Sequence, residues 1–122
     1  MSNSPMEEGL LFNLPAFAAA SGTSPIQKNI NQRGVRVGVN ITTITGGTLT
    51  VTIFGRDAGG STYTLLASAA LAATAFTEML VYPAASNVTN LVSNQPLPPA
   101  WGVNYSAASG TIAATISYAY AN

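Results

Sequence analysis

The sequence predicts an all-β protein, an antiparallel β-sandwich of about seven or eight strands with an extended N-terminal arm. Apolar and polar residues alternate with period two over residues 33–45 and 48–56, the pattern of strands with one buried face. Turn residues recur about every eight to twelve positions, as in a sandwich. No segment with the period of a helix competes strongly. This pattern is compatible with a jelly roll and with an immunoglobulin-like sandwich.

We expect one domain with two parts. The 122 residues suit a single domain that buries a real core. Residues 1–23 show no sustained alternation and predict an N-terminal arm that is extended or partly strand-like, whereas residues 24–122 predict the β-sandwich domain. Because such an arm frays unless something holds it, we expect a partner or a neighbouring subunit to anchor it.

The first clear pair of strands is residues 33–45 and 48–56, separated by Gly46 and Gly47. Two glycines between alternating segments are a strong turn signal, so we expect a β-hairpin. The threonines of the second strand face outward and suit strand geometry without adding charge. The residues expected to face the core are Val35, Val37, Val39, Ile41, Leu49, Val51 and Ile53.

Residues 57–61, DAGGS, predict the next turn. The Asp57 carboxylate can cap its own turn, and Gly59 and Gly60 can accept positive φ. We interpret this stretch as a turn with a protruding tip, not as a ligand site.

Residues 62–72 predict a strand followed by a loop, although their Ala and Leu content also allows a short helical turn near 67–74. Residues 76–82 predict a strand that Pro83 ends. Its two faces are Thr77, Met79 and Val81 on one side and Phe76, Glu78, Leu80 and Tyr82 on the other.

The Pro- and Asn-rich residues 83–100 predict a long crossover between sheets, with a short edge strand at 87–92. Residues 101–107 and 111–120 then predict a final hairpin around residues 108–110.

The charge content is very low. Charged residues make up 7% of the chain, and four basic and four acidic side chains cancel, whereas about 25% is usual. A neutral, charge-poor surface favours association, so we expect protein neighbours to cover much of it. No basic patch suits nucleic acid. Lys28, Arg33 and Arg36 form a weak local cluster, which we interpret as a solvated or interface-pairing edge.

Two apolar segments imitate membrane or export signals. Residues 9–22 follow Glu7 and Glu8 and contain no Lys or Arg, the reverse of a secretory leader. Residues 65–76 are too short to span a bilayer. We therefore predict no membrane partner.

The sequence offers little for catalysis, and we predict no catalytic residue, cofactor, metal site or small-molecule substrate. There is no His and no Cys, which removes the commonest general base and a nucleophile. Lys28 has no neighbouring Ser–Lys motif. Asp57 and Glu78 are isolated acids that we interpret as surface residues, although a pair of them facing across a cleft would suit glycosidic chemistry. Asp57 alone makes no calcium site.

Trp101 follows the Pro-rich segment and begins a predicted strand. We interpret it as a core anchor between the sheets. The alternative is an exposed aromatic platform for a sugar or a base, with Tyr105 as the one other candidate on that face.

Six motifs follow one another between residues 24 and 120. They are Arg33 to Val35, Thr48 to Ile53, Asp57 to Gly60, Tyr63 to Ser68, Val81 to Pro83, and Leu97 to Trp101. This order resembles small β-sandwich proteins encoded among the virion genes of tailed bacteriophages.

The resemblance implies a non-enzymatic accessory virion protein, a capsid decoration (cement) protein assembled in the host cytoplasm and placed on the capsid exterior. The implied partners are the major capsid protein and copies of the chain itself, as trimers. A tail or head-fibre structural component and a carbohydrate-binding β-sandwich module remain as alternatives.

The expected interaction surface combines apolar side chains of the arm, which would lie across a neighbour and contribute about 25 cal/mol per Å², with two arginines. These residues are Leu10, Leu11, Phe12, Leu14, Phe17, Arg33 and Arg36.

Overall fold

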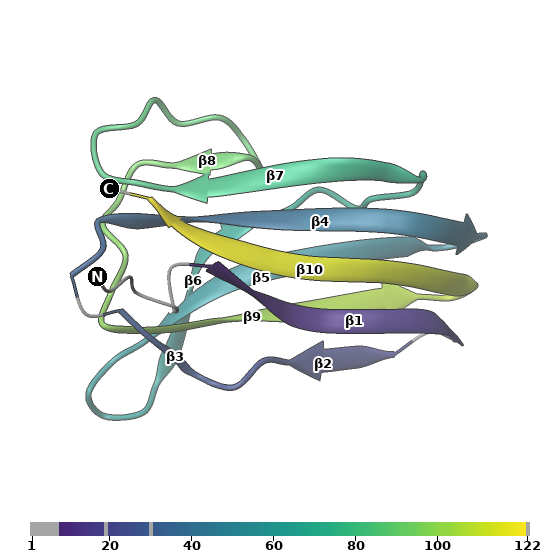
Figure 1. The fold of residues 1–122 in the computed structure, drawn as a ribbon, viewed down its shortest axis with the longest axis horizontal. Helices are drawn as coiled ribbons and strands as arrows, with labels where there is room; N and C mark the ends of the chain where they lie inside the picture. The colour runs from purple at the N-terminus through teal and green to yellow at the C-terminus, as the bar shows by residue number, and fades with distance from the viewer. Residues whose placement is uncertain (1–7, 19, 30, 122) are drawn as a thin grey trace, which may run out of the picture.

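The computed structural model describes residues 8–18, 20–29 and 31–121 and consists of two β-sheets packed face to face (Figure 1). This confirms the predicted antiparallel β-sandwich. Nowhere in those ranges does a helix have the length and apolar character needed to span a bilayer. The strands are β1 (Glu8–Ala18), β2 (Ser21–Thr23), β3 (Gln27–Lys28), β4 (Gly34–Thr45), β5 (Thr48–Arg56), β6 (Thr62–Ala67), β7 (Ala75–Val81), β8 (Val92–Ser93), β9 (Ala100–Ala108) and β10 (Thr111–Ala121).

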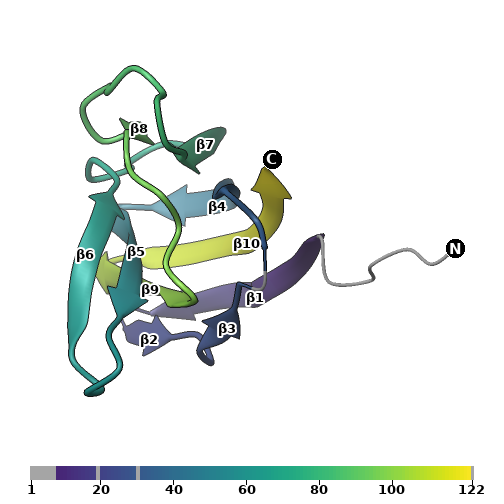
Figure 2. The ribbon, with the colours of Figure 1, turned by 90° about the vertical axis from the view of Figure 1, so that its left-hand side faces the viewer.

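Sheet 1 has the strand order β1-β10-β4-β7-β8, and sheet 2 has the order β2-β9-β5-β6, with β3 also beside β9. Neighbouring strands are antiparallel except the short β8, which joins β7 in parallel. Figure 2 views the sandwich from one end and separates the layer of β6, β5 and β9 from the layer of β4, β10 and β1.

Strands that face each other across the core are joined directly along the chain. In matching order, β1, β10, β4 and β7 of sheet 1 are linked to β2, β9, β5 and β6 of sheet 2. The β4–β5, β6–β7 and β9–β10 links cross at the same end of the sandwich, on the right in Figure 1, where β1 also ends and β2 begins. This is the connectivity of a jelly roll, whereas the immunoglobulin fold places its first two strands side by side in one sheet.

Two predicted hairpins are therefore wrong. β4 pairs with β10 and β7, and β5 pairs with β9 and β6. The links at Gly46–Gly47 and Ser109–Gly110 carry the chain from one sheet to the other instead of joining paired strands. The glycines correctly marked sharp reversals. Each flanking strand buries one apolar face. Its alternation of apolar and polar residues is therefore the same whether the next strand lies beside it in the same sheet or across the core in the other sheet.

These two crossings lie against each other and depend on glycine. Gly47 and Gly110 have φ of 113° and 75°, which disfavours residues with a Cβ. A Cβ on Gly110 would overlap the carbonyl oxygens of Gly46 and Thr45, and one on Gly47 would overlap those of Ser109 and Ala108. The two turns therefore pack backbone to backbone.

The link between β5 and β6 is a true hairpin, as the predicted turn at residues 57–61 requires. Asp57 Oδ1 accepts hydrogen bonds from the backbone N–H groups of Gly59 and Ser61, both at 2.9 Å. Gly60 has φ of 92°. The expectation of positive φ at Gly59 is wrong, because the capped turn needs that conformation at one glycine.

The remaining connections follow the prediction closely. Residues 68–74 form a loop without a helical turn, and Leu71 bridges to Leu49. β7 confirms the strand expected at 76–82. Within the long crossover, the edge strand β8 (Val92–Ser93) overlaps only the end of the predicted segment 87–92.

The core lies between the sheets and confirms the predicted alternation. All seven residues expected to point inward from β4 and β5 are at most 3% exposed. Completely buried side chains from the other strands are Met79, Val81, Trp101, Val103, Ile112 and Ile116.

The segment expected as an arm contributes two strands to the sandwich. β1 pairs with β10 from Glu8–Ala119 to Ala18–Thr111, and β2 pairs with β9. Residues 8–18 are thus strand, as the prediction allowed, but they belong to sheet 1 of their own chain and are not a separate arm.

Candidate interaction surfaces

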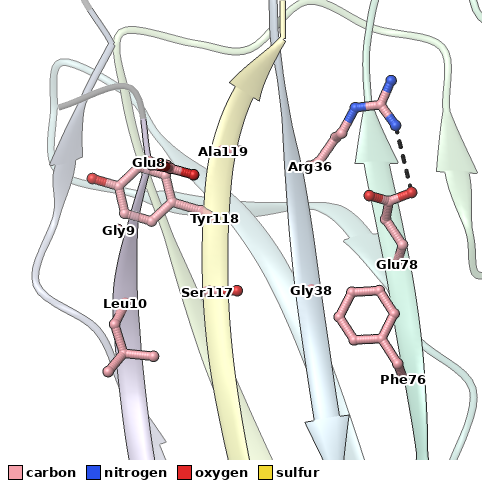
Figure 3. A pocket seen from close by; sticks show the side chains of 10 residues that line it. All are labelled: Glu8, Gly9, Leu10, Arg36, Gly38, Phe76, Glu78, Ser117, Tyr118 and Ala119. Atoms are coloured by element: carbon pink, nitrogen blue, oxygen red, sulfur yellow. Dashed lines mark hydrogen bonds and ion pairs between the residues drawn. The ribbon is translucent and has the colours of Figure 1, made fainter. Parts of the chain in front are cut away.

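The outer face of sheet 1 carries a hollow of about 320 Å³ over four strands (Figure 3). Strand register explains its shape. Leu10 of β1 lies opposite Ser117 of β10, which lies opposite Gly38 of β4, which lies opposite Glu78 of β7. A row with small residues in the middle and larger ones at its ends leaves a depression, which we call the sheet 1 hollow.

Two apolar side chains stand exposed at the sides of this hollow. Leu10 is 59% exposed and Phe76 is 63% exposed. The Phe76 ring lies close above Gly38, where an added Cβ would be 2.8 Å from the ring. Gly38 thus allows the ring to lie low on the sheet.

An ion pair lies at one side of the hollow. Arg36 Nη1 is 3.4 Å from Glu78 Oε1, and each side chain is about half exposed. Exposed pairs of this kind contribute about 0–1 kcal/mol. The pair therefore orients the two groups more than it stabilises the fold.

The structure brings together two of the seven predicted interaction residues. Leu10 and Arg36 line the sheet 1 hollow. Leu11 and Phe12 are half-buried and pack against the chain's own core, with the Phe12 ring 4.9 Å from that of Tyr105. These two side chains are engaged by their own domain.

The other predicted residues lie elsewhere. Leu14 is half-buried. Phe17 pairs through its backbone with Ile112, and its side chain lies outside the described part of the structure. The Arg33 guanidinium lies 5.4 Å from the centre of the Tyr82 ring and, unlike Arg36, does not line the sheet 1 hollow.

Sequence reasoning did not select Phe76. The signal was present, because the alternation in residues 76–82 placed Phe76 and Glu78 on the face away from Met79 and Val81. A single exposed phenylalanine is ordinary, and Phe76 gains significance only from its place beside the hollow that Leu10 also lines.

Trp101 is completely buried, which confirms the core interpretation and rules it out as an exposed sugar-binding platform. Its Nε1–H donates to Tyr120 Oη at 3.2 Å, and Tyr120 Oη–H donates to the Lys28 carbonyl at 2.7 Å. The rings of Tyr118 and Tyr120 lie edge-to-face on Trp101. This chain of contacts ties β9, β10 and β3 together.

The Tyr120→Phe substitution tests that chain of contacts. Burial raises the pKa of the Tyr120 hydroxyl above 10.0, so the folded state disfavours its ionised form. The stabilisation that the Tyr120 hydroxyl adds to the free energy of unfolding is therefore fully present below about pH 10, and it is lost as the pH rises further. Tyr120→Phe should lower the free energy of unfolding by about 1–3 kcal/mol.

The free energy of unfolding should also fall less at high pH in Tyr120→Phe than in the unsubstituted protein, because the variant lacks this ionisable hydroxyl. Urea unfolding of both proteins at about pH 8 and about pH 11 measures this. Equal pH dependence in the two proteins would contradict the role of Tyr120.

The two isolated acids do not face each other. Asp57 is held in its turn next to sheet 2, and Glu78 lies on the outer face of sheet 1. In the described ranges, no three Asp, Glu, His or Cys side chains gather into a set that could hold a metal ion.

Comparison with known proteins finds no matching family model, no matching curated protein and no matching solved structure.

Proposed function

We propose that this chain is a non-enzymatic structural protein of a tailed-phage virion, a capsid decoration protein that reinforces the head through contacts with the shell and with copies of itself. The observation that carries the proposal is the sheet 1 hollow, where Leu10 and Phe76 are both more than half exposed. Exposed apolar side chains gathered at one hollow mark an interaction surface.

Two further features support a packing role. With 7% charged residues and no net charge, the surface offers little repulsion against close neighbours. The jelly roll is a recurrent architecture of viral capsid and lectin domains, although a fold alone does not assign a function.

The mechanism is the burial of apolar area by a rigid sheet. Fully burying a phenylalanine or leucine side chain contributes about 1.5–3 kcal/mol. One such contact is weak, but copies that hold both the shell and each other gain affinity through multivalency.

Imaging tests the location directly. Virions of the phage that encodes the chain would be labelled with an antibody against it and examined by electron microscopy. Label distributed over the head supports the proposal. Label confined to the tail or to fibres would assign the alternative structural role, and unlabelled virions would overturn both.

The Phe76→Asp substitution tests the surface. Placing a charge where an apolar side chain becomes buried should weaken binding to virions that lack the chain by at least about tenfold. Co-sedimentation measures this loss. The matched control is Val88→Asp, because Val88 is also exposed but lies outside the hollow. Equal loss in both variants, or no loss in Phe76→Asp, would contradict the assignment.

A further inference from the structure

A second hollow lies on the outer face of sheet 2 and contains half of the chain's basic residues. It has a volume of about 540 Å³, and we call it the cationic notch. Its lining residues are Ile26, Lys28, Asn29, Arg56, Pro99 and Ala100. The volume lies in the range of sites that bind ligands.

Register places the two basic residues on either side of one small residue. Gln27 of β3 and Gly55 of β5 both lie opposite Trp101 of β9. The next residues, Lys28 and Arg56, therefore flank Ala100. Because the Trp101 side chain is buried in the core, strand alternation directs the Lys28–Ala100–Arg56 row outward. Because neighbouring strands lie about 4.8 Å apart, the Cα atoms of Lys28 and Arg56 are separated by about 10 Å.

Hydrogen bonds hold the backbone at Lys28 and Asn29, although β3 has only two residues. Tyr120 Oη–H donates to the Lys28 carbonyl at 2.7 Å. Asn29 N–H donates to the Pro99 carbonyl at 2.8 Å, and Asn29 Nδ2 donates to the Leu97 carbonyl at 3.0 Å. A site built on a fixed backbone loses little entropy when it binds.

Neither basic side chain of the notch is held in an ion pair by the described part of the chain. Arg36 and Glu78 form the ion pair of the described ranges, and within those ranges Lys28 and Arg56 form none. Asp57 follows Arg56, but its Oδ1 is engaged by two backbone N–H groups of its own turn. Two cations therefore converge on a hollow whose other lining is mainly apolar.

We propose that the cationic notch is a docking site for an acidic peptide segment of a partner protein. A carboxylate lies between Lys28 and Arg56, and a neighbouring apolar side chain covers Ile26, Pro99 and Ala100. Charge complementarity selects a carboxylate, and the apolar lining selects a segment over a small inorganic anion, which would leave that lining wet. A nucleic acid would need more than two cations to bind firmly.

Titration of the ¹⁵N-labelled full-length chain followed by NMR tests the proposal without any virion, so its failure and that of the capsid role are distinguishable. The probe is a model acidic peptide, PMEEGLL, which has the sequence of residues 5–11 of this chain. It is blocked at both ends and joins two carboxylates to apolar neighbours. We expect saturable shifts of Ile26, Lys28 and Arg56. The affinity should fall about tenfold in the Lys28→Gln/Arg56→Gln double variant and fall with added salt.

Two controls sharpen the test. Arg33→Gln removes a cation that lies over Tyr82, outside the notch, and should leave the affinity unchanged. The peptide PMQQGLL should not bind. The proposal is overturned if PMEEGLL gives no saturable shift in the notch, if PMQQGLL binds equally well, or if inorganic phosphate binds there more tightly than PMEEGLL.

Discussion

Replacing Gly110 with alanine is expected to destabilise the protein by more than about 4 kcal/mol, beyond the effect of most single substitutions. An alanine Cβ would overlap the backbone oxygens of Gly46 and Thr45. Neither oxygen belongs to a flexible side chain, so the two crossings would have to separate. The residue would also keep φ near 75°, which itself costs about 1–2 kcal/mol for a residue with a Cβ. Denaturant unfolding followed by circular dichroism measures the loss.

Gly46→Ala is the matched control for this prediction. Gly46 also has positive φ, at 58°, but no atom lies within 4 Å of an added Cβ. Its substitution should cost only the conformational term of about 1–2 kcal/mol. If the two variants are equally stable, the crossings do not pack against each other as described. If Gly110→Ala does not fold at all, Gly46→Ala still separates overlap from backbone conformation.

Trp101→Ala is expected to cost about 3–5 kcal/mol, the range for deleting a large buried aromatic side chain. Trp101 is completely buried and supports the rings of Tyr118 and Tyr120. Its removal leaves a cavity between the sheets and takes a donor from the Tyr120 hydroxyl. Urea unfolding gives the magnitude of this loss. It is followed by circular dichroism, because the variant lacks the single tryptophan that intrinsic fluorescence would report.

Phe76→Ala serves as the control for Trp101→Ala. Phe76 is aromatic but 63% exposed, and surface substitutions usually change stability by less than about 0.5 kcal/mol. A loss of stability at Phe76 as large as that at Trp101 would show that the sheet 1 hollow is structural and would remove its role as an interaction surface.

Period-two alternation was sufficient to predict β4, β5, β7, β9 and β10 and their buried faces, but not β1 and β2. In β4, valines alternate with Arg36, Gly38 and Asn40, and the inward set is completely or almost completely buried. The Asp57 turn was equally readable, because a carboxylate followed by glycines satisfies its own backbone hydrogen bonds.

Pairing between distant strands was beyond reach of the same reasoning. A turn at Gly46–Gly47 does not say whether β5 lies beside β4 or across from it, since both arrangements bury the same residues. The sheet 1 hollow depends on Leu10, Ser117, Gly38 and Glu78 meeting in one row. That row joins four regions far apart in the sequence, so Leu10 and Arg36 could be proposed one by one but not as residues of one hollow.

The position of β10 determines when this protein can fold during its synthesis. β10 is the last of the described strands in sequence order, yet it lies between β1 and β4 inside sheet 1, and Glu8 pairs with Ala119. Until β10 has emerged from the ribosome, β1 lacks its partner strand and β4 presents an open edge. Sheet 1 can therefore be completed only after β10 has been synthesised, and rapid closure of this long-range pairing protects the exposed strand edges from aggregation.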